Sequence, residues 1–325
     1  MPIPDLLKRG ATATVTIAVL LAMILVSMYY SWTPAPIRSA QQRSQPIGVQ
    51  TTDALIQVAD TLLTKNGGYI SNDVTPPSWW LDNIQNWEFG VLKQVRDFTR
   101  VLRNELSRSQ SQSTEDPALI VAEPKFSIDN DSWMFPRAEG AYRDGINALQ
   151  GYRDRLAANA ADAHFYARAD NLVDWLNVVE KRLGNSVQQL GMSVGKMSVS
   201  DRSMGVALET GENLAPSDIG ESIEKTPWYR IDDVFYEARG TAWALLALFE
   251  AAEADFAEVL QDKNATISYR QIIRELEAAN AGLATPWIMN GGGFNMWPNH
   301  SLVMASYLSA ANTAISNLIT LLENG

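Results

Sequence analysis

The sequence predicts an all-α protein: a multi-helix bundle of antiparallel helical hairpins preceded by one N-terminal transmembrane helix. Three observations carry this prediction. Apolar residues recur at helical spacing through most of the chain after residue 51, strand patterns are nearly absent, and one charge-free apolar stretch stands near the start. With 325 residues in the chain, we expect residues 51–325 to form one helical domain with a sizeable core.

The apolar stretch covers residues 11–30 and contains no charged residue. As a helix, residues 11–28 span about 27 Å, close to the thickness of the hydrocarbon core of a bilayer. Tyr29, Tyr30 and Trp32 follow at the place where aromatic residues gather at a membrane–water interface. We therefore expect residues 11–30 to be a transmembrane helix.

The residues flanking this stretch bear on cleavage and orientation. Lys8 and Arg9 also suit a secretory signal peptide, but no small-residue cleavage site follows, which favours a retained anchor. Counting cations gives a tie, because Arg38 and Arg43 lie on the other side. Since Lys8 and Arg9 adjoin the apolar stretch, we expect residues 1–10 in the cytoplasm and the helical domain on the other side of the membrane.

The composition excludes several kinds of chemistry. The chain has no cysteine, which removes disulfides, thiolate catalysis and cysteine metal sites. The net charge of −11 argues against a nucleic-acid partner, because phosphate binding requires a basic face and no basic run occurs. The chain has only two histidines and no Glu-x-x-His pair, so we expect neither a metal nor another cofactor.

The first elements of the domain follow the apolar stretch. Residues 31–50, rich in Pro, Ser, Gln and Arg, are predicted to be a linker that extends to at most about 70 Å. Thr52 is expected to cap a first helix that ends at Gly67 and Gly68. A second helix carries an apolar stripe over residues 91–106.

The helical pattern then continues with two interruptions. Residues 107–116 are polar and low in complexity, and residues 184–227 include a long Gly-, Ser- and Met-rich part without a period, so we expect loops there. The role of the second loop is not indicated by the sequence. Further helices are predicted over residues 138–159, 165–190, 232–260, 268–283 and 301–322.

Two of the predicted hairpins match each other at a separation of one hundred residues, namely 133–190 and 233–290. Phe135 and Gly140 correspond to Phe235 and Gly240 in this alignment. The matches are consistent with a duplication. They are equally expected of any two amphipathic hairpins, because apolar residues at helical spacing coincide easily.

Six stretches of the chain are distinctive: residues 67–77, 82–97, 107–117, 165–176, 225–245 and 299–307. Together they resemble the bacterial family known as domain of unknown function 2333. The likeness covers nearly all of the chain after about residue 51. It implies a membrane-anchored protein of Gram-negative bacteria, and it implies no activity. The stretches are GGYISNDVTPP (67–77), DNIQNWEFGVLKQVRD (82–97), SRSQSQSTEDP (107–117), FYARADNLVDWL (165–176), KTPWYRIDDVFYEARGTAWAL (225–245) and NHSLVMASY (299–307).

A Trp-rich segment is the first candidate site. It combines flat aromatic faces with carboxylates, as sugar-binding platforms and glycosidases do, and Glu88 and Asp82 are the candidate acid and base. The alternative is that Trp and Pro pin a loop while Asp82 or Asn83 caps the following helix. The candidate ligand or partner surface consists of Trp79, Trp80, Asn83, Trp87, Arg96 and Arg100.

Histidines and the remaining acids are weaker candidates. His300 is a candidate general base, but Asn299-His300-Ser301 is also a typical helix N-cap, which is the favoured interpretation. Asp232 and Asp233 open a long helix, where acids complement the helix dipole. Neither group forms a complete set of nucleophile, base and oxyanion donors.

The sequence supports three functional hypotheses. The first is a non-enzymatic binding or scaffold protein of the cell envelope, with a protein or cell-wall partner near the membrane. The second is a carboxylate-dependent hydrolase or lyase that acts on cell-wall glycan through Asp82 and Glu88. The third is a scaffold that forms a homo-oligomer through the last apolar helix, using Leu302, Val303, Ala305, Leu308, Ile315, Leu318 and Ile319.

Overall fold

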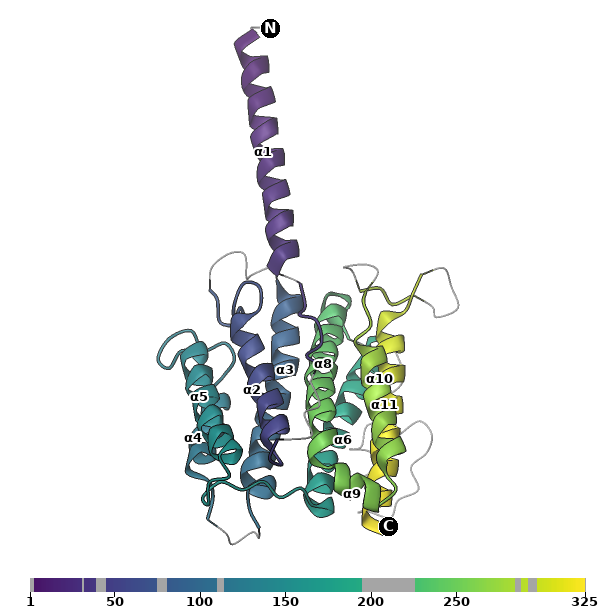
Figure 1. Cartoon of the computed structure of the whole chain (residues 1–325). Coiled ribbons are helices and arrows are strands. Elements are labelled where there is room, and N and C mark those ends of the chain that lie inside the picture. Colours follow the sequence, from purple (N-terminus) through teal and green to yellow (C-terminus); the bar gives the residue numbers. More distant parts are fainter. Residues whose placement is uncertain are drawn as a thin grey trace, which may run out of the picture.

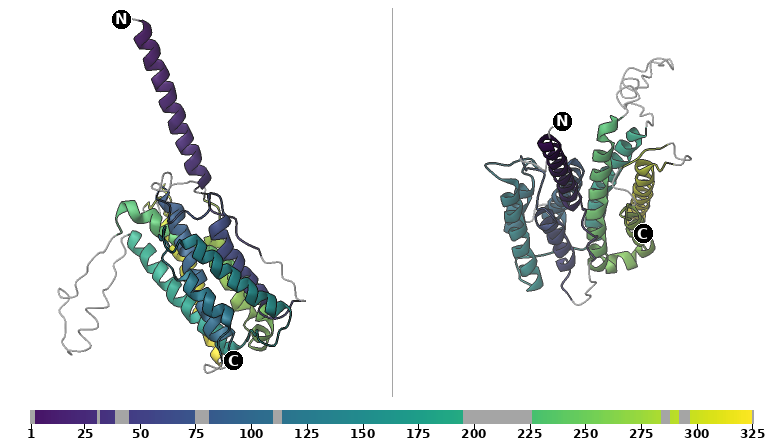
Figure 2. Two further views of the ribbon diagram at one scale, coloured as in Figure 1. Left: turned by 90° about the vertical axis from the view of Figure 1, so that its left-hand side faces the viewer. Right: turned by 90° about the horizontal axis from the view of Figure 1, so that it is seen from above.

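The computed structural model describes residues 3–30, 32–38, 45–74, 81–109, 114–194, 226–283, 288–291 and 297–324. Within these ranges the structure is helical apart from turns and one isolated bridge between Asn290 and Asn299, so the all-α class is confirmed. Helix α1 (Ile3–Tyr30) projects from one end of a bundle of helices that run up and down beside one another (Figures 1 and 2).

The bundle consists of two units. The first unit comprises α2 (Val49–Thr64), α3 (Asp82–Val101), α4 (Pro117–Phe126) and α5 (Ala138–Ala157). The second unit comprises α6 (Ala169–Ser193), α8 (Ile231–Asp255), α10 (Thr266–Ala279) and α11 (His300–Asn324). Three short helices complete the described chain: the π-helix η2 (Leu102–Leu106), the 3-10 helix η3 (Trp228–Arg230) and α9 (Ala257–Asp262).

The end of helix α2 is determined by local sequence, and its start is fixed by a contact with a distant residue. Gly67 and Gly68 follow it with φ angles of 85° and 73°, which confirms the predicted stop. Its start differs from the prediction: the helix begins at Val49, and the hydroxyl of Thr52 donates back to a carbonyl inside the first turn. The buried carboxylate of Asp255, on α8, accepts the amide of Thr51 instead of a local cap.

Helices α3 and α8 form the centre of the bundle and run parallel. Asn86 and Gly90 of α3 face Asp233 and Glu237 of α8, so both helices advance in the same direction. A Cβ on Gly90 would lie 2.1 Å from the carbonyl oxygen of Glu237, and a Cβ on Gly240 would lie 2.1 Å from that of Trp87. The two backbones therefore touch, and only glycine fits at either position.

The units repeat the same packing around this central pair. In each unit the third and fourth helices pack together, as do the first and the fourth and the second and the third. The second and third helices of the two units correspond in sequence at a separation of 150 positions: Pro77, Asp82 and Gly90 match Pro227, Asp232 and Gly240. The buried side chains Leu119, Ala122 and Phe126 of α4 match Tyr269, Ile272 and Leu276 of α10.

This arrangement does not support the duplication predicted at a separation of one hundred residues. Segment 133–190 is not a packed hairpin, because α5 packs mainly against α4 and α2, whereas α6 packs mainly against α11. The matched residues also differ in their surroundings. Phe135 is exposed while Phe235 is buried, and Gly140 has no neighbour within 4 Å while Gly240 touches α3.

Several other boundaries depart from the predictions. Helix α4 was missed, because it has only 10 residues and contains Pro124. The predicted helix 232–260 breaks at Phe256, where α9 begins. Much of the region 184–227, including most of its Gly-, Ser- and Met-rich part, lies outside the described residues, and α6 extends to Ser193, slightly beyond the predicted helix end at residue 190.

The predicted linker is partly attached to the bundle. The indole N–H of Trp243 donates to the carbonyl of Ala35 at 3.1 Å, and Arg38 forms ion pairs with Glu250 and with Glu277. Tyr30, the last residue of α1, packs against the bundle, with its ring over Gly67. Residues 32–38 therefore follow the bundle surface and do not hold it away from α1 (Figure 1).

Candidate functional site

Glu88, the candidate acid, is buried and forms an ion pair inside the protein. Its carboxylate is fully buried and lies 2.6 Å from the ammonium of Lys65, which is also buried. It further accepts the backbone amides of Ile70 and Ser71 and the hydroxyl of Ser71 at 2.5 Å. Burial raises the pKa of Glu88, while Lys65 and these donors favour the ionised form. The group holds the segment after α2 against α3.

Asp82 and Glu88 do not share a cleft. Asp82 is exposed at the first residue of α3, where its carboxylate accepts the amide of Asn83. Glu88 lies almost two turns further along the helix and faces the interior. A hydrolase needs both carboxylates to converge on an open space, and the burial of Glu88 removes that geometry.

The structure does not bring the other residues of the predicted aromatic surface together. Trp79 and Trp80 lie outside the described residues. Trp87 is fully buried and packs edge-on against Trp243 of α8 with ring centroids 5.1 Å apart. Asn83 is half-buried, and neither it nor Asp82 is the N-cap of α3, which is Leu81. Trp87 is thus a core residue and presents no face to a ligand.

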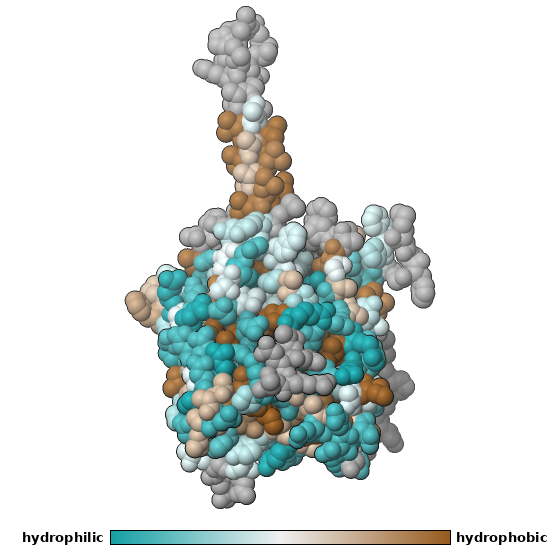
Figure 3. All heavy atoms as spheres, viewed as in Figure 1, coloured by the Kyte–Doolittle hydropathy of each residue, from teal (hydrophilic) through white to brown (hydrophobic). Residues whose placement is uncertain are grey.

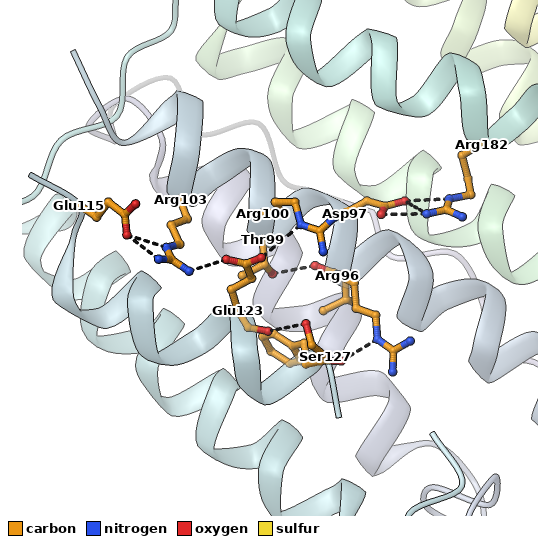
Figure 4. Close-up of polar contacts among 11 residues, drawn as sticks. Arg96, Asp97, Thr99, Arg100, Arg103, Glu115, Glu123, Ser127 and Arg182 are labelled. Atoms are coloured by element: carbon orange, nitrogen blue, oxygen red, sulfur yellow. Dashed lines mark hydrogen bonds and ion pairs between the residues drawn. The ribbon is translucent and has the colours of Figure 1, made fainter. Parts of the chain in front are cut away.

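Charged side chains of α3 attach α4 and α6, as Figure 4 shows. Arg96 donates to the carbonyls of Phe126 and Ile128 at the end of α4, at 2.6 and 2.7 Å. Arg100 pairs with Glu123 of α4 at 3.2 Å. The neighbouring Asp97 accepts two hydrogen bonds from Arg182 of α6.

Arg103, which the sequence did not single out, joins this network. It bonds Glu115 at 2.5 Å and Glu123 at 2.6 Å, and Figure 4 shows it between the two carboxylates. Most of these charges have a partner on a neighbouring helix, so this face is a structural contact between elements of the same chain. An ion-pair network of this kind depends on distant residues, and a single helical pattern does not reveal it.

His300 begins α11, but the cap is its neighbour. Asn299 accepts the amide of Leu302 at 2.9 Å, which confirms the predicted N-cap. The Nδ1 atom of His300 accepts the amide of Met289 at 2.9 Å, and burial lowers the pKa of the imidazole. With one ring nitrogen occupied by a backbone amide, His300 holds the turn before α11 in place.

Acidic residues meet at the start of the central pair. Asp233 accepts the side-chain amide of Asn86 at 2.7 Å and lies 3.9 Å from Arg230. Burial, with Asp82 and Asp232 nearby, raises the pKa of Asp233 to about 6. Within the described ranges, no group of three His, Asp or Glu side chains could hold a metal ion.

Two helices of the chain are strongly apolar, and their surroundings differ. Among the described residues α11 is the one helix long and apolar enough to cross a bilayer, and α1 contains the shorter apolar stretch Thr14–Ser27. The apolar residues of α11, among them Leu308, Ile315 and Leu318, are buried in the bundle. Its other face is mostly Ser, Thr and Asn, so α11 is an amphipathic bundle helix.

The packing of α11 also bears on the predicted oligomer. Ala305, Leu308, Ile315 and Leu318, which were expected to join two copies, are buried within one chain. Only Leu302 and Val303 of that set are exposed. These buried residues therefore supply no apolar surface for a second copy.

The apolar side chains of α1 are exposed on all sides of the helix. Figure 3 shows hydrophobic atoms covering its described part, whereas the visible side of the bundle is mainly hydrophilic. The exposed set is Val15, Ile17, Val19, Leu20, Leu21, Met23, Ile24, Leu25 and Val26. Exposure of apolar side chains on all sides of a helix to water is unfavourable, so this surface of α1 is expected to be covered.

Comparison with known proteins gives one match. The family profile described as "Uncharacterized protein conserved in bacteria (DUF2333)" matches residues 6–325. The comparisons with curated proteins and with solved structures find no match.

Proposed function

The chain belongs to this bacterial family, DUF2333, and on that premise we propose that it is a single-pass inner-membrane protein with a periplasmic helical domain. In this proposal the domain is a non-enzymatic binding or scaffold module of the cell envelope. Helix α1 is the anchor, and the bundle presents its surface to a protein or cell-wall partner close to the bilayer.

The observation that carries the proposal is the exposure of α1. Transfer of each exposed Leu, Ile or Val side chain from water to an apolar medium is favourable by about 1.5–3 kcal/mol. A bilayer covers all of them at once, and the 28 residues of α1 exceed the length needed to span one. A second support is that the candidate catalytic groups already bind other groups of the chain; Glu88 in particular forms a buried ion pair with Lys65.

The anchor and its orientation are tested together in cells. The chain has no cysteine, so a single one introduced at Ile267, an exposed position at the far end of the bundle, reports its own side of the membrane. We expect labelling by an impermeant maleimide in spheroplasts, and retention of the protein in membranes washed with carbonate. Labelling only after lysis would reverse the orientation, and release by carbonate would remove the anchor.

The leading alternative is a hydrolase or lyase acting on cell-wall glycan. Glu88→Gln alone is a poor test, because it breaks a buried ion pair and destabilises the fold. Lys65→Met is the matched control, since it breaks the same pair and keeps the carboxylate. Activity on purified peptidoglycan that survives Lys65→Met and is lost in Glu88→Gln would establish the enzyme and overturn the proposal. We expect no activity in the unaltered protein.

The partner is sought by cross-linking in intact cells. A photoreactive amino acid on exposed positions of α4 and α11, for example at Val121 and Thr313, samples both outer faces of the bundle. We expect a discrete cross-linked product with an envelope component. Products between two copies of the chain would favour the homo-oligomeric scaffold.

A further inference from the structure

Exposed aromatic side chains gather at one end of the bundle, where α1 leaves it. Within the described ranges outside α1, every exposed Trp, Tyr or Phe belongs to this group. We call it the aromatic end, and it consists of Trp32, Trp133, Phe135, Trp228, Tyr229 and Trp297.

Contacts place these residues at the same end. The loop that bears Phe135 is joined to the residues after α2, because Asn72 bonds Ser132 at 3.0 Å and Tyr69 bonds Asn130 at 3.1 Å. Tyr30, the foot of α1, packs on Gly67 in that same segment. Trp228 directly precedes α8, whose start faces the start of α3.

The loop before α11, which bears Trp297, lies at the same end of the bundle. Gly291 bonds the carbonyl of Pro298 at 3.0 Å, next to Trp297, and His300 lies beside Phe235 near the start of α8. Both units place an exposed aromatic before their last helix, in the repeated tripeptides Met134-Phe135-Pro136 and Met296-Trp297-Pro298. Phe135 is 96% exposed and Trp297 is 58% exposed. In Figure 1 the two loops lie on opposite sides of α1.

From this arrangement we infer that the aromatic end lies in the headgroup layer of the bilayer that holds α1. The inference rests on the proposed anchor. Trp and Tyr have an apolar body and a polar tip and favour the membrane–water interface. Because residues 32–38 are bound to the bundle, the anchor leaves little distance between that layer and this end.

The occupant is a lipid surface bound through aromatic side chains and not through charge. The exposed acids Asp73, Asp129 and Asp131 stand at the same end and outnumber Arg137 and Arg230 there. Anionic lipid would therefore not strengthen the contact. The opposite end exposes aliphatic residues such as Ile267 and Leu321 and, among the residues that the structure describes, no exposed Trp, Tyr or Phe.

The test uses the full chain in phospholipid vesicles, with single cysteines carrying a spin label. The native chain has no cysteine, so each label is unique. Phe135→Cys, Trp228→Cys and Trp297→Cys report the aromatic end, and Ile267→Cys and Leu321→Cys are the matched controls at the other end. Val19→Cys, in α1, reports the anchor itself. Collision rates with oxygen, which enters lipid, and with a soluble nickel chelate give the depth of each label.

We expect the three labels of the aromatic end to show a several-fold higher ratio of oxygen to nickel collisions than the two controls. The ratio should be equal in zwitterionic and anionic vesicles. Ratios equal to those of the controls, with Val19 still in lipid, would overturn this inference and leave the anchor intact. A Val19 label in water would overturn the proposed anchor. Immersion of only one flank of the aromatic end would also overturn the inference about this end. A change in the collision ratio seen only when purified peptidoglycan is added would do the same.

Discussion

Helices α3 and α8 hold equivalent places in the two units and touch along their length, but their side chains differ. The outward face of α3 carries Lys93, Arg96 and Arg100, and η2, which continues it, carries Arg103; all four bind acids or carbonyls of other elements. Helix α8 is buried on nearly all sides, because α2, α3, α6, α10 and α11 surround it. The position of a helix in the whole bundle, and not its place in the repeat, decides how polar it is.

The difference extends into the core. Glu88 of α3 is buried with Lys65, and the equivalent position of α8 is the buried Ala238. Gln94 likewise corresponds to Ala244, and both are buried. The first unit therefore carries polar groups that need partners, whereas the second unit fills the same places with small apolar side chains. Four tests address this contrast.

The largest effect is expected at Glu88. Glu88→Gln leaves the ammonium of Lys65 buried without its counter-charge, which costs about 3–5 kcal/mol of the free energy of unfolding. Lys65→Met should cost a similar amount, and the double variant should recover most of the loss because no charge remains. Urea unfolding followed by circular dichroism measures all three. A loss below about 1 kcal/mol in Glu88→Gln would contradict the role of the pair.

The shared contact of the two helices comes next. Ala at Gly90 or Gly240 forces the α3 and α8 backbones apart, and we expect a loss of about 3 kcal/mol in each variant. Gly140→Ala is the matched control, since nothing lies within 4 Å of its added Cβ; it should gain about 0.5–1 kcal/mol from helix propensity. Thermal unfolding of the three variants checks the order, and equal behaviour at Gly140 and Gly240 would refute the close contact.

The third test concerns the start of α8. The pKa of Asp233 rises from 3.8 to about 6 on folding, so its stabilising contribution is present below about pH 4 and is lost as the pH rises through about 6. The equivalent residue of the first unit is Asn83. Asp233→Asn should raise the stability at pH 7 by about 1 kcal/mol, allowing for partial solvent screening, and by little at pH 4. Unfolding curves at both pH values decide it, and an unchanged difference would exclude Asp233 as the titrating group.

The smallest effect is expected for the ion pairs that hold the third helix of each unit, α4 and α10. Arg103 joins a network with Glu115 and Glu123, whereas its equivalent, Glu253, pairs with Arg270, whose side chain is more exposed than that of Arg103. Double-mutant cycles should give about 1 kcal/mol for Arg103 with Glu123 and about 0.3 kcal/mol for Arg270 with Glu253. A stronger coupling energy for Arg270 with Glu253 than for Arg103 with Glu123 would contradict this order.

The sequence predicted those features that depend on neighbours along the chain. The stop of α2 at Gly67, the stripe of α3 and the cap at Asn299 follow from glycine conformation, helical period and side-chain capping. The partner of Glu88 could not be predicted, because Lys65 lies 23 positions earlier beyond a turn, and nothing local joins the two residues.

The repeat illustrates how apolar matches mislead. At a separation of one hundred residues they aligned Phe135 in a loop with Phe235 in the core. At 150 residues the matches include Gly90 with Gly240, which form the contact between the α3 and α8 backbones, and Pro77 with Pro227. Matches of glycine and proline occur less easily by chance than matches of apolar residues at helical spacing. The exposed aromatics before α5 and α11 were also missed, because their exposure depends on how the loops pack.

The parallel contact of α3 with α8 has a consequence for the order in which the protein folds. The chain is made from the N-terminus at about 5–20 residues per second, so α8 follows α3 after roughly 8–30 seconds. During that interval the face of α3 around Gly90 has no partner, and a helix hairpin of the first unit cannot cover it. Folding is therefore completed only by the second half of the chain, and a chain cut short before α8 would expose its unfinished core to chaperones and proteases.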